Sequence, residues 1–413
     1  MSLVYRARAF GPLANVEWTI PPGVSAVVGP NRVGKSTLLA LPEFLAATVH
    51  GSLNDAVKQL FDGVTHLRNL NAPADVSPSV GLLSHGTAWE AELTVTGGAI
   101  AAYCTERMSH DGADLIVRPF GSVHGDCEGR TVQLGKNLIP HACWERYVSI
   151  KEHFPIFEKE EPLTAEEMTP ITPQAAPFGA QAVHLGAWMF AAIVAARSYK
   201  TYRYQIQHLQ RYGSIQSSDT TLDKLGENVF PLLRNWRDSS ETEARFDFVI
   251  STLREAFPHI SKVDFEQAGQ TVTMAVRDRR WANKKIPISR ESTGLVTALL
   301  QLCAVASGTQ NGLVTIDELE TSLHPHAIRV LIAAFRRWAK EHDLRIVLAT
   351  QSETVLDQFH DDPGQIYVIE PGQEITPRSL TEMFDGEYLN QFSLGDLFSH
   401  LEFGSNRESP TST

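Results

Sequence analysis

The sequence predicts an α/β fold built around a parallel sheet, and three observations support this prediction. The apolar run Val24–Val28 leads directly into a glycine-rich segment, Gly29–Ser36. Two further apolar runs, Leu313–Ile316 and Leu344–Ala349, lie on either side of a stretch with helical spacing. Strands of a parallel sheet are covered on both faces, so they are continuously apolar rather than alternating. We therefore expect these three runs to form strands of a buried core sheet.

The N-terminal part of the chain predicts strands and a helix. Residues 3–28 alternate between polar and apolar side chains before they become continuously apolar, which predicts strands. From Gly29 to about Leu45 we expect a loop followed by a helix, which Pro42 should kink or end. Residues 88–105 alternate with period two around a Gly-Gly pair, which predicts a hairpin, and a strand-rich stretch follows at 115–134.

The middle and C-terminal parts predict helices and further strands. Residues 157–180 are acidic and rich in proline, so they cannot build a core and we expect an exposed connection. Alternation over residues 262–288 predicts strands. Helical spacing predicts helices at 183–212, 221–256, 295–306 and 328–339.

The composition excludes several classes of protein. Hydrophobic residues make up 43% of the 413 residues and charged residues 20%, which is typical of a globular protein and excludes a disordered or collagen-like chain. The net charge of −12 excludes a uniformly basic nucleic-acid coat protein. Four cysteines predict no disulfide framework and favour a reducing compartment. We find no signal peptide and no apolar stretch of the ~20 residues that a bilayer requires, so we expect a cytoplasmic protein without membrane contact.

The strongest functional signal is the segment Gly29–Ser36, which fits G-x-x-x-x-G-K-[ST] in full. A buried strand before it and a helix after it disfavour the alternative, a glycine turn that happens to precede a helix. Gly29 and Gly34 let the backbone bend so that N–H groups point at phosphate oxygens. Lys35 would reach the β- and γ-phosphates of ATP, and Ser36 would supply a hydroxyl to Mg²⁺. The predicted nucleotide-binding residues are Gly29, Pro30, Asn31, Arg32, Val33, Gly34, Lys35, Ser36 and Thr37.

A second signal is the pair of acids that ends the apolar run Leu313–Ile316. Asp317, at the carboxyl edge of the predicted strand, can hold Mg²⁺ through water. Glu318 points the other way and could act as the general base that polarises the attacking water. Acidic strand ends are common, so the pair gains its functional interpretation from the phosphate loop upstream.

The residues that follow carry a resemblance to a known group. The segment from Asp317 to Pro325 (DELETSLHP) resembles the DEPEtsLHP stretch of ABC-type ATPases of the SMC, RecF and overcoming-lysogenization-defect (OLD) group, with Leu319 where that group usually has proline. The segment Ser289–Leu295 looks like the signature segment that precedes the acidic strand in this group. The N-terminal VVGPNRVGKSTLL and the C-terminal YLNQFSLGDLF are similar as well, so the resemblance covers about residues 3–45 and 285–398.

This resemblance implies a P-loop NTPase with an ABC-type ATPase head, composed of a parallel core sheet and an antiparallel β-subdomain with a mostly helical insert. It also implies a head-to-head homodimer or higher oligomer around ATP. Ser292 and Gly294 of one subunit would then contact the γ-phosphate bound by the other, although Ser292 could also be a simple helix N-cap. The expected domains are an N-terminal lobe at 1–150, an insert at 151–284, a C-terminal lobe at 285–403 and a disordered tail at 404–413.

One departure from the group concerns the residue after the run Leu344–Ala349. The group usually has histidine there, whereas this chain has Gln351. Glutamine can orient a water molecule, but it cannot carry a proton at neutral pH. We therefore expect slow turnover and a long-lived ATP-bound dimer, and a kcat that Gln351→His leaves unchanged would argue against this.

Two basic and aromatic stretches leave DNA or RNA binding open. The first, Arg277–Lys285, contains Trp281 and lies in an expected hairpin turn, where a solvated tip is the simpler interpretation. The second, Arg197–Tyr212, interleaves arginines with tyrosines, and helical spacing would also allow the tyrosines to pack in a core.

Three functions follow from these motifs. OLD-type enzymes append a Toprim nuclease, but residues 354–413 contain no Asp-x-Asp, so we expect an ATPase without a fused nuclease. The leading hypothesis is a sensor or scaffold subunit that controls a separate effector, a nuclease or toxin, in bacterial anti-phage defence. The alternative is a RecF-like DNA-binding clamp for repair. A small-molecule P-loop kinase is disfavoured by the signature segment and by the Leu-His-Pro element.

Overall fold

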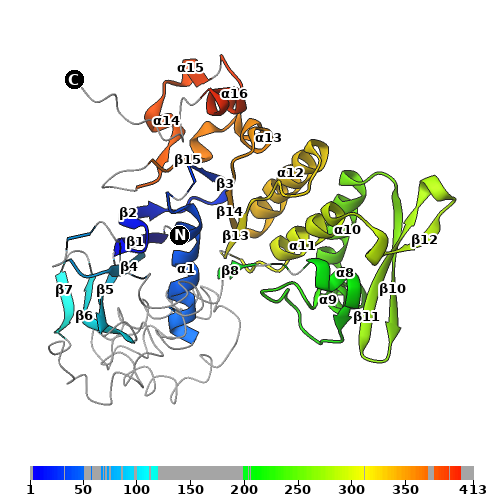
Figure 1. The fold of residues 1–413 in the computed structure, drawn as a ribbon, viewed down its shortest axis with the longest axis horizontal. Coiled ribbons are helices and arrows are strands. Elements are labelled where there is room, and N and C mark those ends of the chain that lie inside the picture. The colour runs from blue at the N-terminus through cyan, green and yellow to red at the C-terminus, as the bar shows by residue number, and fades with distance from the viewer. Residues whose placement is uncertain are drawn as a thin grey trace. The chain divides into compact units, whose positions relative to one another are not determined.

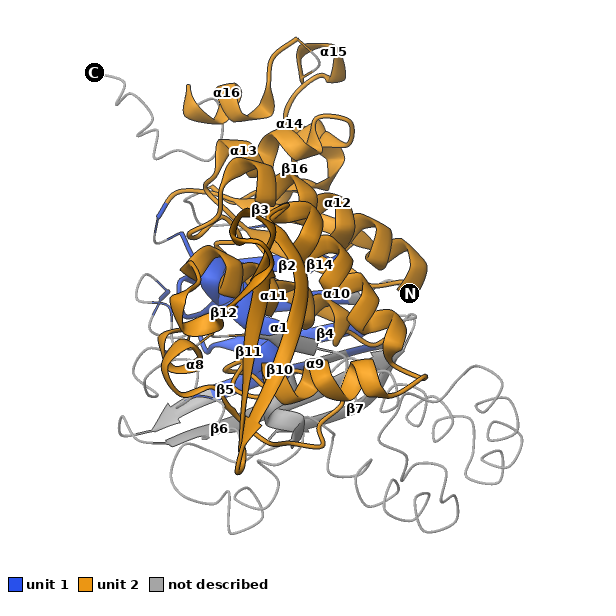
Figure 2. Cartoon of the chain, turned by 90° about the vertical axis from the view of Figure 1, so that its right-hand side faces the viewer, with its two compact units in different colours: residues 1–20, 31–197, 371–376 blue, residues 21–30, 198–370, 377–413 orange. Residues whose placement is uncertain are grey.

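The computed structural model forms two compact units (Figure 2). Unit 1 comprises residues 1–20, 31–197 and 371–376, and unit 2 comprises residues 21–30, 198–370 and 377–413. The expected domain boundaries at residues 150, 284 and 403 remain predictions. The structure describes residues 3–31, 33–50, 57, 67, 69, 72–73, 76–84, 87–96, 100–110, 113–119, 199–202, 204, 206–310, 312–370, 376–389 and 391–400.

Unit 1 contains an antiparallel sheet in the order β2-β1-β4-β5-β6-β7 (Figure 1). Its strands are β1 (Leu3–Phe10), β2 (Leu13–Thr19), β4 (Ser79–Ser84), β5 (Thr87–Thr96), β6 (Ile100–His110) and β7 (Ala113–Pro119). This sheet confirms the predicted strands of the N-terminal part, including the hairpin at 88–105. The remainder of the strand-rich stretch predicted at 115–134, after Pro119, lies outside the described residues.

Among the described residues of unit 1, α1 (Lys35–His50) follows the phosphate loop directly. Its Phe44 ring packs edge-on against Phe10 of β1, with the ring centroids 5.0 Å apart. The expectation that Pro42 could end the helix is wrong, because α1 continues for eight residues beyond it. Leu41 and Phe44, on either side of the proline, are fully buried, so packing holds both halves of the helix despite the missing N–H.

Unit 2 is built on a sheet in the order β16-β15-β3-β14-β13-β8. The strands are β3 (Gly23–Val28), β8 (Tyr199–Thr201), β13 (Leu313–Asp317), β14 (Arg345–Ala349), β15 (Ile366–Val368) and β16 (Arg378–Ser379). All neighbours pair in parallel except β15 and β16. The three apolar runs that predicted a core sheet are therefore adjacent strands, with β14 between β3 and β13.

The longer helices of unit 2 share its hydrophobic core, and the last two of them contact this sheet. They are α8 (Ile206–Tyr212), α9 (Val229–Asp238), α10 (Glu243–Ala256), α11 (Thr293–Ala306) and α12 (Pro325–His342). Helices α10, α11 and α12 pack against one another (Figure 1). Almost every side chain of α11 is buried, which explains why its sequence is apolar on all sides rather than amphipathic.

Two of the predicted helices differ from the structure. Residues 221–256 form two helices rather than one, because Ser239–Thr242 interrupts the pattern with side chains that favour caps and turns. Within 183–212, residues 199–201 form strand β8, which pairs with β13, so tertiary context overrides the helical spacing. The segment 183–198 lies outside the described residues, as do 157–180.

The stretch at 262–288 forms the predicted antiparallel strands of unit 2. Strands β10 (Ile260–Ala268) and β11 (Thr271–Asp278) pair along their length, and β11 also pairs with β9 (Ser214–Ile215) and β12 (Lys284–Pro287). The C-terminal part adds short helices: α13 (Glu353–Leu356), α14 (Leu380–Met383), α15 (Gly386–Leu389) and α16 (Leu394–Ser399). The expected tail at 404–413 lies outside the described residues. Among the described residues, no helix combines the length and apolar character that a bilayer crossing needs.

Candidate functional site

Three strands of unit 2 end at one edge of the sheet, and each carries a predicted functional motif. Because β3, β14 and β13 are parallel neighbours in register, their carboxyl ends lie side by side. The N–H of Thr350 donates to the carbonyl of Val27 at 3.2 Å, and the N–H of Glu318 donates to the carbonyl of Ala349 at 2.9 Å. The start of the phosphate loop, the acidic pair and the segment containing Gln351 therefore leave the sheet together.

The phosphate loop connects β3 to α1. Gly29 and Pro30 belong to unit 2, the segment from Asn31 to Thr37 belongs to unit 1, and Arg32 lies outside the described residues. Val33 is buried, Lys35 is half-buried, and the side chains of Asn31 and Ser36 are exposed.

Gly34 is required by both conformation and packing. It has φ +107°, a region that side chains disfavour. A Cβ at this position would also lie 3.1 Å from Leu13 Cδ2 and 3.2 Å from Pro12 Cγ of the β1–β2 turn. The loop therefore follows a course that only glycine permits, as expected of a backbone that approaches phosphate closely.

The acidic pair at the end of β13 stands on unusual backbone. Asp317 is the last residue of the strand and is exposed, and Glu318 is exposed with φ +52°. A residue other than glycine in this left-handed region costs of order 1–3 kcal/mol, and such residues concentrate at functional sites. The hydroxyl of Thr321 donates to Glu318 Oε2 at 3.3 Å, and Ser322 has φ +65°.

Leu319, which replaces the proline usual in the related group, anchors the acidic loop in the core. Its side chain is fully buried, and its carbonyl accepts a hydrogen bond from Gln301 Nε2 of α11 at 3.1 Å. The departure from the group pattern is therefore accommodated by packing.

Sequence reasoning did not assign a role to Glu320, which joins the acidic loop to the end of β14. Its Oε1 accepts hydrogen bonds from the Thr350 hydroxyl at 2.9 Å and from the Gln351 N–H at 3.1 Å. Its Oε2 is buried and has no hydrogen-bond partner within the described residues. The only sequence signal was the third acid of the DELE segment, and its partners lie 30 and 31 residues away, so pattern alone could not have found them.

The predicted signature segment begins α11. Ser292 is the N-cap of this helix, and its hydroxyl accepts a hydrogen bond from the Leu295 N–H at 3.3 Å. Gly294 is buried against the carbonyl of Ser322, so any side chain there would overlap the acidic loop. The N-cap interpretation is therefore met within the chain, and the contact of Ser292 and Gly294 with a second subunit's nucleotide remains a prediction.

The Leu-His-Pro element has a structural explanation. His324 is the N-cap of α12, where its Nδ1 accepts a hydrogen bond from the His326 N–H at 3.2 Å. Pro325 occupies the first turn of the helix, where its missing N–H costs nothing. The element fixes the start of α12 immediately after the acidic loop.

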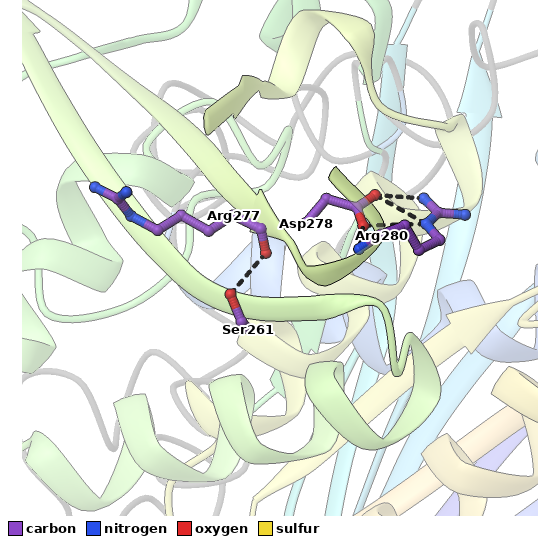
Figure 3. Close-up of polar contacts among 4 residues, drawn as sticks. All are labelled: Ser261, Arg277, Asp278 and Arg280. Atoms are coloured by element: carbon purple, nitrogen blue, oxygen red, sulfur yellow. Dashed lines mark hydrogen bonds and ion pairs between the residues drawn. The ribbon is translucent and has the colours of Figure 1, made fainter. Parts of the chain in front are cut away.

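The basic hairpin tip uses most of its cations in internal ion pairs, of which Figure 3 shows the one between Arg280 and Asp278. Arg277 Nε lies 2.7 Å from Asp264 Oδ2, and Lys285 pairs with Glu266. Arg280 pairs with the fully buried Asp278, which the backbone N–H of Arg280 also bonds at 2.8 Å. These hydrogen bonds from Arg280 hold the pKa of Asp278 below its ordinary value.

Figure 3 shows Arg277 pointing away from the Asp278–Arg280 pair, so the two ion pairs do not form one patch. Arg279, Trp281 and Lys284 are exposed, and Trp281 retains 62% of its surface. This arrangement favours a solvated hairpin tip.

In the second basic and aromatic stretch, the described tyrosines support the packing alternative. The rings of Tyr202 and Tyr204 stack with centroids 5.9 Å apart and pack against the core of unit 2. Burial raises the pKa of both hydroxyls. Tyr212 is exposed, whereas Arg197 and Arg203 lie outside the described residues.

Comparisons with known proteins agree with this fold. A family model described as "AAA domain, putative AbiEii toxin, Type IV TA system" matches residues 216–357. No curated protein matches the chain. Among solved structures, an Smc head bound to the C-winged helix domain of ScpA aligns with a TM-score of 0.52 and 10% identity, over 93% of this chain and 100% of that chain.

Two further Smc heads align with lower scores. One, from Pyrococcus furiosus, carries an extended coiled coil and is bound to the C-terminal domain of ScpA; it has a TM-score of 0.41 and 13% identity over 93% and 98% of the two chains. The other, from Thermotoga maritima, has a TM-score of 0.39 and 13% identity over 92% and 99%. The alignment with the TM-score of 0.52 and the matching AAA family model, rather than these two, show that the chain has the fold of an ABC/SMC-like ATPase head, which confirms the predicted fold class.

Proposed function

We propose that the chain is an ABC-type ATPase that binds ATP, hydrolyses it slowly, dimerises around it and controls a separate effector protein. The observation that carries this proposal is the shared edge of β3, β14 and β13, where the phosphate loop starts and where Glu318 and Gln351 leave the sheet. Strand ends at one edge of a parallel sheet are where ligands bind in α/β proteins. The effector is proposed to be a nuclease or toxin of an anti-phage defence system.

The residues present fit ATP and Mg²⁺. Gly34 has the left-handed φ that a tight loop around a phosphate uses, and Ser36 and Asp317, which carry a hydroxyl and a carboxylate, are exposed. Oxygen ligands of this kind suit Mg²⁺, and backbone N–H groups at the start of α1 suit phosphate. Bound Mg²⁺ would neutralise charge on the phosphates as the terminal phosphoryl group leaves.

The protein's own part in hydrolysis divides among five side chains. Lys35 would hold the β- and γ-phosphates, and Ser36 and Asp317 would hold the metal. Glu318 would accept the proton of the attacking water, and its exposure and its left-handed backbone support this role. Gln351 would orient the water without taking its proton, which supports slow turnover.

Dimerisation would complete the site. Ser292 and Gly294 stand at the N-terminus of α11, where the positive end of the helix dipole favours a phosphate. In the dimer they would face the γ-phosphate held by the other subunit. The family description names a putative toxin of a toxin–antitoxin system, and the aligned Smc head was solved with a protein partner. Both support control of another protein as the output.

Purified protein tests the ATPase part directly. We expect the wild type to bind ATP and hydrolyse it slowly, and Glu318→Gln to bind ATP and form a dimer measurable by light scattering. Lys35→Ala should lose at least roughly tenfold in nucleotide affinity, since it removes charge-assisted hydrogen bonds, and should stay monomeric. Equal ATP binding by the wild type and Lys35→Ala would refute the assignment of the phosphate loop.

The effector part needs a separate experiment. Tagged Glu318→Gln and Lys35→Ala proteins, each isolated from native cells in the presence of ATP, should differ in what they retain. A protein retained only by Glu318→Gln would be the candidate effector, and identical retention by both variants would contradict an ATP-gated scaffold.

A further inference from the structure

The C-terminal segment Ser393–Leu397 lies against the helix that follows Gln351, although the proposed hydrolysis assigns it no role. Helix α16 begins in this segment, and it packs on α13, which begins two residues after Gln351. Both elements belong to unit 2 and lie at one end of it (Figure 1). Leu394 is fully buried and Leu397 is nearly so, in the core cluster that also contains Leu356.

The two helices approach each other closely at Gly395. Its backbone N–H donates a hydrogen bond to Asp357 Oδ1 at 2.8 Å. A Cβ on Gly395 would lie 2.8 Å from Glu353 Cβ and 3.1 Å from Glu353 Cα. Real Cβ atoms do not approach other carbons to 2.8 Å, and Cα and Cβ cannot swing aside as the end of a long side chain can. Glycine is therefore needed here for close packing.

Two backbone N–H groups at the start of α16 donate hydrogen bonds to side chains. One acceptor is the helix's own N-cap, and the other lies in the turn that follows α13. Ser393 is the N-cap, and its hydroxyl accepts the Asp396 N–H at 3.0 Å. Asp357, from the turn that follows α13, takes the Gly395 N–H. A buried helix start without such partners would be costly, so these bonds fix the two helices in one relative position.

The same contact bears on the residue proposed to orient water. Ser352 precedes α13, and its carbonyl accepts the N–H groups of Val355 and Leu356, so the chain at 351–352 is continuous with the helix. On its other side, Gln351 is bonded through its N–H to Glu320. The backbone of Gln351 is thus fixed at one end by the acidic loop and at the other by α13.

We propose that Ser393–Leu397 is an intramolecular latch, with Gly395 and Asp357 as positioning residues that hold α13 and thereby set the place of Gln351 during ATP hydrolysis. This proposal rests on the proposed function. A shift of the α13 backbone by several tenths of an ångström would move Gln351 relative to the strand ends that define the site. Misplacement on that scale lowers turnover without removing any group that binds nucleotide.

Gly395→Ala is the main test, and Gly386→Ala is its matched control. Gly386, in α15, has nothing within 4 Å of its Cβ position, so the added methyl group meets open space. We expect Gly395→Ala to lower kcat between about fivefold and a hundredfold while the affinity for ATP stays within twofold of the wild type. Gly386→Ala should change neither quantity.

A pair of milder substitutions tests the hydrogen bond. Asp357→Ala removes the acceptor for the Gly395 N–H and should lower kcat in the same direction as Gly395→Ala. Asp357→Asn keeps a carbonyl oxygen at the same place, so it should restore most of the lost turnover. These variants keep the proposal testable if Gly395→Ala does not fold.

The double variant Gly395→Ala/Gln351→Ala separates positioning from general damage. If the latch acts through Gln351, adding Gly395→Ala to Gln351→Ala should lower kcat no further. A full additional loss, or a proportional fall in ATP affinity and kcat together, would show a merely structural role and overturn the proposal.

Hydrogen exchange provides a readout that does not depend on turnover. Backbone amides of residues 352–359 should exchange faster in Gly395→Ala than in Gly386→Ala, because the latch no longer holds α13. Equal exchange in the two variants overturns the latch even if the wild type is an active ATPase. A wild type that does not hydrolyse ATP overturns the proposed function instead, and in that case the exchange rates alone decide whether the latch exists.

Discussion

The carboxyl edge of the β3–β14–β13 sheet and the tip of the β11–β12 hairpin both concentrate charged side chains in unit 2, but the charges are held differently. At the sheet edge, Asp317 and Glu318 are exposed, and Glu318 stands on left-handed backbone. At the hairpin, Arg280 is paired with the buried Asp278 and Arg277 with Asp264. The hairpin charges are paired with opposite charges, whereas the exposed Glu318 stands on strained backbone, a feature that concentrates at functional sites.

The largest effect that would separate the two regions is expected from Glu318→Gln. The substitution keeps the shape of the side chain but removes its ability to accept a proton, so kcat for ATP hydrolysis should fall by roughly 100-fold or more. ATP affinity should stay within a few-fold of the wild type. Glu341→Gln, an exposed residue of α12, is the control and should leave kcat unchanged. If Glu318→Gln hydrolysed ATP as fast as the wild type, Glu318 would not be the catalytic base at the sheet edge.

The next largest effect is expected from Glu320→Ala. This change removes the acceptor that holds the Thr350 hydroxyl and the Gln351 N–H, so kcat should fall by about tenfold with little change in ATP affinity. Glu320→Gln retains one carbonyl oxygen and should recover part of the loss. If Glu320→Ala instead weakened ATP binding and turnover equally, Glu320 would belong to the binding surface and not to the positioning of Gln351.

At the hairpin, Asp278→Asn should affect stability and not turnover. The pKa of Asp278 is held below its ordinary value of 3.8, so its ionised form stabilises the folded state above about pH 4, and this contribution is lost as the pH falls through the lowered pKa. Thermal unfolding at pH 7 should occur a few degrees lower in Asp278→Asn, and the difference from the wild type should shrink toward pH 3. Asp247→Asn, exposed on α10, is the control. If the difference in unfolding temperature between Asp278→Asn and the wild type grew at low pH, the ionised form of Asp278 would not be the stabilising one.

The smallest effect is expected from replacing Arg279, Trp281 and Lys284 together by alanine. If the tip is a solvated turn, binding of single-stranded DNA or RNA, measured by anisotropy at low salt, should change by less than about twofold. Salt-sensitive binding that disappears in the triple variant would favour the alternative RecF-like clamp. That result would also show that exposed cations can matter at the hairpin despite the paired ones beside them.

Much of the core could be predicted because local patterns coincide with the final structure. The apolar runs at 24–28, 313–316 and 344–349 are buried on both faces in the sheet, so their composition alone identifies them. The turn at Gly34 could also be predicted, because glycine meets a local backbone need there: its φ is +107°.

Other features depend on contacts between distant parts of the chain. The strand at Tyr199–Thr201 exists because β13 pairs with it, and its own spacing suggested a helix. The role of the Glu320 carboxylate follows from its hydrogen bond with the Thr350 hydroxyl, and the need for glycine at position 395 follows from its close packing against Glu353. In each case, residues separated by about 30 to more than 110 positions meet in the fold, and no periodicity along the sequence encodes such a meeting.

The central place of β14 limits how the molecule can respond to a nucleotide. Its five residues, Arg345–Ala349, are paired with β13 on one side and with β3 on the other. A slide by one residue would disrupt both ladders and turn every side chain to the opposite face. The strand therefore acts as a fixed frame. We expect a conformational change on nucleotide binding to involve the segments that follow the strand ends: the acidic loop after β13 and the stretch from Thr350 into α13. A partner that distinguishes the nucleotide-bound form of this chain from the nucleotide-free form would then contact those segments or residues that move with them.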